Sequence, residues 1–188
     1  MSFMVFPPEV NSALMYSGAG SGPLMAAASA WNELAADLES TATSYQSVIA
    51  QLTGGPWLGP TATRMAAAAA PYIAWLQGSS IQAAQTSGQA SLAAAAYESA
   101  FDATVPPTVV AANRALLAAL VATNFLGQNT PAIAATEALY MEMWFQDGLT
   151  MDTYALTSQQ AIALPQPDGQ SAAVFHAVER VDHKVQHH

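Results

Sequence analysis

The stretch from Leu24 to Leu52 reads LMAAASAWNELAADLESTATSYQSVIAQL. Large apolar side chains recur in it every seven residues, at Leu24, Trp31, Leu38, Tyr45 and Leu52. A second row fills the intermediate positions, at Leu34, Thr41 and Val48. Because this heptad pattern is sustained over four repeats, it predicts one helix about 45 Å long that packs with coiled-coil geometry.

A glycine- and proline-rich turn follows this predicted helix. Residues 54–60 read GGPWLGP, which favours a tight reversal of the chain. Apolar residues at similar spacing then predict a third helix that ends near Thr104; they are Met65, Tyr72, Leu76, Ala83, Ala90, Tyr97 and Phe101. Pro71 is expected to kink this helix, because its ring displaces the carbonyl four residues earlier. The second and third helices are therefore expected to form an antiparallel hairpin.

Shorter elements surround the predicted hairpin. Pro7-Pro8 opens a first helix, and Glu9 in its first turn faces the positive end of the helix dipole. A fourth helix is expected over about 109–124, and a fifth helix from Pro131. Alanine, the best helix former, is abundant and strand formers are sparse. The predicted fold class is all-α, an elongated five-helix rod.

The predicted hairpin is incomplete by itself. Each of its helices touches one neighbour, so apolar side chains remain on an open face. The economical solution is a second hairpin from a partner, which completes a four-helix bundle. Two alternatives stay open: the fifth helix folds back over the face, or several copies of the chain form a bundle of their own.

Composition excludes several classes of protein. The chain has 13 acidic and 4 basic residues and a net charge of −9, so it has no basic stripe for nucleic acid or for anionic lipid. It has no cysteine, which excludes disulfides and thiolate chemistry. Its first residues do not form a standard signal peptide. The best apolar run, residues 109–126, is interrupted by Asn113, Arg114 and Asn124 and is not expected to span a bilayer.

No catalytic group of residues emerges. All four histidines lie after residue 175, so the helical body has no imidazole to activate a serine. His183 and His187 have the spacing of metal ligands on a helix, but no third ligand accompanies them, which favours a solvated tail. Glu137, Glu142 and Asp147 do not share one narrow face and are expected on a solvated helix surface. We expect a non-enzymatic protein without cofactor or metal.

Short motifs occur along the chain in a specific order. Pro7-Pro8-Glu9 lies near the N-terminus, and Trp57-Leu58-Gly59 forms a Trp-x-Gly turn between alanine-rich helices. Two further phrases, Tyr72–Leu76 and Glu137–Trp144, follow in the predicted third and fifth helices. Together these residues resemble the N-terminal domain of the mycobacterial PPE (Pro-Pro-Glu) family, over about residues 1–150.

The resemblance implies a helical partner. In this family the second and third helices pack on the two helices of a PE (Pro-Glu) family protein, and a type VII secretion system exports the heterodimer. The residues expected at this interface are Leu24, Trp31, Leu34, Leu38, Tyr45, Val48, Leu52, Met65, Tyr72 and Leu76. Trp57 and Gly59 are expected near the secretion motif of the partner, so that the two chains present a composite signal.

The resemblance also implies a cytosolic chaperone of the EspG type, bound at the loop between the fourth and fifth helices. The residues that match this loop are Asn124, Phe125, Leu126 and Gly127. An apolar pair at a helix end, bordered by polar residues, is expected to be exposed for binding. The alternative is that both side chains fold back as a hydrophobic C-cap contact.

The expected organisation is a PPE-type helical domain over 1–163 and a short tail over 164–188. After about Phe145 the sequence is expected to depart from the family, and its end is compatible with a short natural tail, a truncation or a frameshift. The family implies a protein that is secreted or on the cell surface, transiently cytoplasmic with its chaperone, and active in host–pathogen interaction. A membrane-active or nutrient-uptake protein of the mycobacterial outer layer is the alternative, with membrane association after export.

Overall fold

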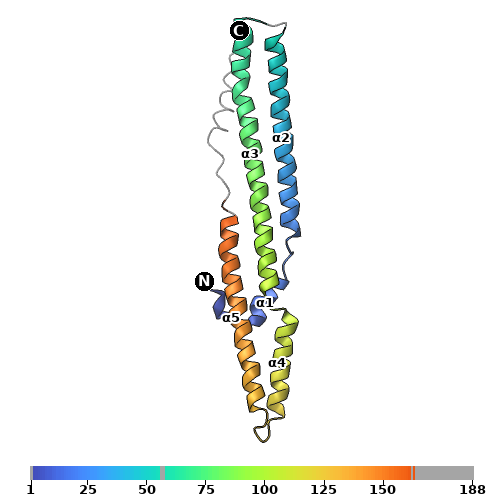
Figure 1. Cartoon of the computed structure of the whole chain (residues 1–188), viewed down its shortest axis with the longest axis vertical. Helices are drawn as coiled ribbons and strands as arrows, with labels where there is room; N and C mark the ends of the chain where they lie inside the picture. The colour runs from blue at the N-terminus through green and yellow to red at the C-terminus, as the bar shows by residue number, and fades with distance from the viewer. Residues whose placement is uncertain (1, 56–57, 162, 164–188) are drawn as a thin grey trace, which may run out of the picture. The chain divides into compact units, whose positions relative to one another are not determined.

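The computed structural model describes residues 2–55, 58–161 and 163, and within them every regular element is a helix (Figure 1). The elements are η1 (Phe3–Val5), α1 (Pro8–Tyr16), α2 (Gly22–Gly54), α3 (Pro60–Ala103), α4 (Pro107–Ala122) and α5 (Thr130–Ala161). The all-α class and the five helices of the sequence prediction are confirmed.

Prolines mark where several of these helices begin. Pro8, Pro60 and Pro107 are the first residues of α1, α3 and α4. The first turn of a helix tolerates proline because its backbone nitrogen needs no partner there. Pro71 is different, because it lies inside α3 and the helix continues through it without ending. The observed bounds differ from the predicted ones by at most two residues, which is ordinary fraying at helix ends.

The chain divides into two compact units, and each is described by itself. The first holds residues 2–25 and 91–163; the second is the hairpin of residues 26–90. The predicted tail, 164–188, lies outside the described residues.

The hairpin unit consists of most of α2 and of α3 up to Ala90. The Oγ of Ser80 donates to the carbonyl of Ala35 (2.9 Å), and the Oγ of Ser87 donates to the carbonyl of Ala28 (2.7 Å). Later residues of α3 thus pair with earlier residues of α2, so the two helices run antiparallel, as predicted (Figure 1).

Alanine forms the α2 side of this helix contact. Ala28, Ala35 and Ala42 lie seven residues apart and are 5%, 6% and 0% exposed. Small side chains let two helix backbones approach closely, and the close approach explains why serine hydroxyls of α3 reach α2 carbonyls. Ala42 also packs against Ile73 and Leu76 of α3. The heptad register predicted from the sequence is present, but its buried row is the alanine row.

The other unit is built around α1. Met15 of α1, Ala100 of α3 and Met151 of α5 form a buried cluster, and Phe3, Tyr97, Phe101 and Tyr154 pack against it. Larger side chains fill this core than fill the hairpin. The pair α4 and α5 extends from it and ends in the loop 123–129 (Figure 1).

Buried hydrogen bonds fix the connection between α3 and α4. The backbone N–H of Val105 donates to Oδ1 of Asp147 in α5 (2.8 Å), and the hydroxyl of Ser12 in α1 donates to the Val105 carbonyl (2.5 Å). Asp147 and Ser12 are 0% exposed. Three segments distant in sequence therefore meet at one residue. The prediction that Asp147 lies on a solvated helix surface was wrong, because this carboxylate caps the connection.

Candidate functional site

Large apolar side chains remain exposed on the hairpin. Trp31, Leu34, Tyr45 and Val48 are 41%, 43%, 46% and 54% exposed. Leu52 of α2 and Tyr72 of α3 are also exposed. We call these six residues the open face of the hairpin.

The position of the open face follows from the alanine row. Trp31 and Tyr45 come three residues after Ala28 and Ala42, which places them one step round the helix from the buried contact. The positions on the opposite flank, four residues after the alanines, are polar: Asn32, Glu39 and Gln46. Between Ala28 and Gln46, the large apolar side chains of α2 that are exposed therefore lie on one flank.

Aromatic rings connect the two helices across this face. The rings of Tyr45 in α2 and Tyr72 in α3 lie 5.2 Å apart in an edge-to-face arrangement. Tyr72 in turn stacks with Trp75, 5.8 Å away. Rings held against one another lose little further conformational freedom when a partner covers them, so this surface is suited to binding.

The remaining predicted interface residues have other environments. Leu24, Leu38 and Met65 are half-buried. Leu76 is 3% exposed and belongs to the hairpin's own core. Trp57 lies outside the described residues. Gly59 precedes α3 with φ +117°, a backbone conformation that favours glycine.

The motif Pro7-Pro8-Glu9 serves the packing of α1. Pro8 is fully buried. Oε2 of Glu9 accepts a hydrogen bond from the hydroxyl of Tyr140 in α5 (2.9 Å). Burial and then this bond raise the pKa of Tyr140. The guanidinium of Arg114 in α4 covers the same ring, 3.6 Å from its centroid. Tyr140 lies within the phrase Glu137–Trp144, and no local spacing in the sequence indicates its contact with Glu9.

The loop between α4 and α5 presents the most exposed large apolar side chains of the described chain. Phe125 is 86% and Leu126 is 93% exposed. Gly127 follows them with φ +79°, which lets the chain turn back toward α5. Asn124 accepts a hydrogen bond at Oδ1 from the backbone N–H of Asn129 (2.8 Å). The pair is therefore displayed, and the alternative of a folded-back C-cap contact does not apply.

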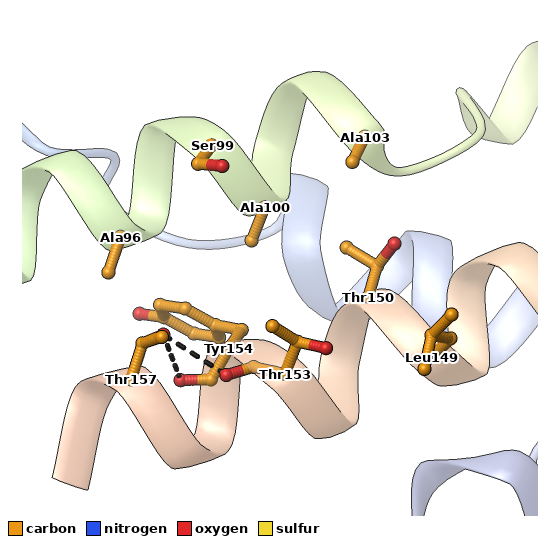
Figure 2. A pocket seen from close by; sticks show the side chains of 9 residues that line it. All are labelled: Ala96, Ser99, Ala100, Ala103, Leu149, Thr150, Thr153, Tyr154 and Thr157. Carbon is orange, nitrogen blue, oxygen red and sulfur yellow. Dashed lines mark hydrogen bonds between the residues drawn. The ribbon is translucent and has the colours of Figure 1, made fainter. Parts of the chain in front are cut away.

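A shallow cavity of about 260 Å³ lies between α3 and α5 (Figure 2). Figure 2 shows Ala96, Ala100 and Ala103 of α3 facing Thr150 and Tyr154 of α5. Its walls are mostly alanine and threonine, and such walls offer neither a general base nor an activated nucleophile. Within the described residues no group of three His, Cys, Asp or Glu side chains is placed to hold a metal ion.

By length and composition, one stretch of the described chain is apolar enough to cross a membrane. Residues 60–122 contain an 18-residue window of mean hydropathy 1.5, of which 11% is buried. This differs from the sequence expectation, which required an uninterrupted apolar run. Length and composition alone carry this finding.

Comparison with known proteins agrees with the motifs. The model of the PPE family matches residues 2–165. PPE family protein PPE15 of Mycobacterium tuberculosis is 62% identical over 161 residues, which cover 86% of this chain and 41% of the relative. PPE family protein PPE45 of Mycobacterium bovis, described as uncharacterized, is 62% identical over 155 residues, 82% of this chain and 38% of the relative.

A third relative is less similar but covers more of the chain. PPE family protein PPE61 of Mycobacterium tuberculosis, also described as uncharacterized, is 52% identical over 179 residues, 93% of this chain and 44% of the relative. The chain spans about two-fifths of the length of these curated relatives. With its family model matched over nearly the whole described length, the chain belongs to the PPE family.

Proposed function

We propose that this chain is a non-enzymatic interaction protein whose hairpin binds the two helices of a PE-family protein. The observation that carries the proposal is the open face of the hairpin, where Trp31, Tyr45 and Val48 are 41–54% exposed on one flank of α2. Because each side chain is already about half buried, a partner that covers it recovers about half of the 1.5–3 kcal/mol of full burial, or about 1 kcal/mol each.

The chemistry of the face selects a helical apolar partner. Its residues repeat at helical spacing and carry no charge, and a helix laid along them would contact successive turns. A second hairpin on this face makes a four-helix bundle, which is a common solution for two amphipathic helices. The polar flank with Asn32, Glu39 and Gln46 would remain in solvent.

The proposal extends to export. A type VII secretion system would recognise the heterodimer, with Trp57 and Gly59 contributing to a signal shared with the partner. Before export, an EspG-type chaperone would bind the heterodimer in the cytoplasm. Its contacts on this chain would be Asn124, Phe125, Leu126 and Gly127. The exposed pair Phe125–Leu126 supports this assignment. The exported complex would act at the cell surface or outside the cell, in contact with the host.

The test is the mass of the complex. The chain is expressed alone and with PE proteins encoded in the same genome, and soluble material is analysed by size-exclusion chromatography with light scattering. We expect poor solubility alone and a 1:1 complex with a matching PE protein. A monodisperse monomer that binds none of the PE proteins would rule out the heterodimer. A stable homo-oligomer of this chain would rule it out as well.

A membrane-active protein of the outer layer is the second candidate. The apolar window within residues 60–122 favours it. Flotation of the purified complex with liposomes separates the two functions. The heterodimer proposal expects the complex to stay in the aqueous fraction, whereas a membrane-active protein would float with the lipid.

A further inference from the structure

Amide side chains organise the loop that carries Phe125 and Leu126. The side-chain nitrogen of Asn129 donates to the carbonyl of Leu120 (3.0 Å) and to Oγ1 of Thr123 (2.8 Å). Its backbone N–H donates to Oδ1 of Asn124 (2.8 Å). Asn129 thus connects the start of α5 to the last turn of α4.

Gln128 adds a second bridge. Its side-chain nitrogen donates to the carbonyl of Thr123 (2.7 Å), and its Oε1 accepts the backbone N–H of Leu126 (2.9 Å). Gln128 therefore holds the backbone of one displayed residue directly against the end of α4. The two amides together satisfy carbonyls that a helix end leaves without partners.

These bonds explain how two apolar side chains stay in water. Burial of Phe125 and Leu126 against α4 would be favourable, because it removes apolar surface from solvent. The loop backbone is instead held by polar contacts on its inner side, and the two side chains remain 86% and 93% exposed. Breaking the bridges would free the loop to sample conformations in which the pair folds back.

We propose that Asn129 and Gln128 are positioning residues, which hold Phe125 and Leu126 in the conformation that the chaperone binds. This inference rests on the proposed chaperone role of the loop. A ligand that binds one conformation has an apparent affinity reduced by the fraction of molecules in that conformation. Loss of a bridge therefore weakens binding without removing any group that the chaperone touches.

The experiment compares two asparagines, Asn129 just before α5 and Asn113 in α4, whose side chains each donate across this pair of helices. Asn129→Ala removes the bridge at the loop. Asn113→Ala is the control, because the Asn113 side chain also donates from α4 to an α5 carbonyl, that of Thr136 (3.1 Å), away from the loop. Asn129→Asp is a second test variant that keeps the size of the side chain and removes its donor. Phe125→Asp tests the binding site itself.

Two quantities are measured on the full chain in complex with its helical partner. The first is hydrogen exchange of the Leu126 amide before chaperone is added. The second is the dissociation constant for the EspG-type chaperone that binds the wild-type complex. One net hydrogen bond changes an equilibrium constant by about fivefold to tenfold. Asn129→Ala removes two such bonds, so we expect it to speed exchange and to weaken binding by about fivefold or more. Asn129→Asp should act in the same direction, and Asn113→Ala should leave both within about twofold.

The outcomes separate this inference from the proposed function. Retained binding by Phe125→Asp would overturn the chaperone site itself. If Phe125→Asp abolishes binding while Asn129→Ala binds like the wild type, the loop is the site but Asn129 does not position it. If Asn129→Ala weakens binding with unchanged exchange of Leu126, Asn129 contacts the chaperone, and the positioning role is wrong.

Discussion

In the hairpin of residues 26–90 the row of α2 that faces α3 is alanine, at positions 28, 35 and 42. The unit around α1 instead buries Met15 and Met151, and Oδ1 of its buried Asp147 accepts a hydrogen bond from a backbone N–H. Alanine offers little apolar area, so the hairpin gains close contact but a thin core. One unit buries methionine between its helices, whereas the hairpin buries alanine on the α2 side and leaves Trp31, Tyr45 and Val48 exposed.

The two units use their large side chains in different ways. Where α3, α1 and α5 meet, large and polar side chains are used for internal packing. Along the hairpin, alanine forms the α2 side of the helix contact, and Trp31, Tyr45 and Val48 stay exposed. Stability of the unit around α1 should therefore depend on single buried residues, and partner binding by the hairpin should depend on single exposed ones.

The largest expected effect on stability comes from Asp147. Asp147→Ala leaves the buried N–H of Val105 without its partner, and we expect a loss of about 3 kcal/mol in the free energy of unfolding. Asp147→Asn is the control, since its side-chain oxygen still accepts that bond. Urea titration followed by circular dichroism compares them. Equal loss for both variants would mean that the hydrogen bond does not hold the connection.

Gly148 and Gly78 test close packing in one unit against open space in the other. A methyl group at Gly148 would lie 2.5 Å from Sδ of Met4 and 3.0 Å from its Cα, so Gly148→Ala should cost about 2 kcal/mol. Nothing lies within 4 Å of a methyl group at Gly78 inside α3, and Gly78→Ala should stabilise by about 0.5–1 kcal/mol. Thermal unfolding gives both signs, and a shift of the same sign for both would contradict this contrast.

The pH dependence of stability should also report on Asp147. Burial raises the pKa of its carboxyl above 3.8, while the Val105 N–H opposes this. The folded state therefore holds the proton more tightly than the unfolded one, and this stabilisation is full below pH 3.8 and lost as pH rises through the raised pKa.

Asp147→Asn, which does not titrate, should therefore gain stability relative to the wild type as the pH rises from 3.8. The pKa of Asp152 is lowered by the backbone N–H of Phe3 and then by the hydroxyl of Ser2, so its contribution is lost as pH falls. Both proteins keep Asp152, and the difference between their urea midpoints isolates Asp147. A difference that does not change with pH would show that Asp147 titrates normally.

The smallest expected effect concerns the motif residue Glu9. Tyr140→Phe removes the hydroxyl that donates to Glu9 and should cost about 0.5–1 kcal/mol. Tyr45→Phe, on the open face, is the matched control and should stay within about 0.5 kcal/mol of the wild type. If Tyr140→Phe is also neutral, the bond to Glu9 does not hold α1 to α5.

Much of this fold follows from local signals in the sequence. Prolines at helix starts and glycines in turns predict where the helices begin and end. The heptad pattern, with the turn that follows it, predicts the hairpin. The pattern did not reveal that alanine would occupy the buried row, because periodicity is the same for neighbouring rows of one helix. In α3, the same kind of spacing predicts Leu76 on the partner surface, although this side chain packs inside the hairpin.

Contacts between segments that are distant in the chain could not be predicted from the sequence. Asp147 meets Val105 only after α3, α4 and α5 have folded, so no local spacing marks it as buried. The bond between Glu9 and Tyr140 joins residues 131 positions apart. The pair Phe125–Leu126 could be predicted as exposed from its neighbours, but the amide bridges that display it required the geometry of both helix ends.

One pair of variants tests most directly whether the open face is the binding surface. Val48→Asp places a carboxylate on that face. The control is Thr43→Asp, which introduces the same carboxylate in place of another β-branched residue, at an exposed position of α2 that lies off the face. Each is coexpressed with the PE protein that pairs with the wild type, and light scattering measures the mass. We predict that Thr43→Asp forms the 1:1 complex and Val48→Asp does not, because binding would bury its carboxylate. Complexes of equal mass and yield from both variants would contradict the account.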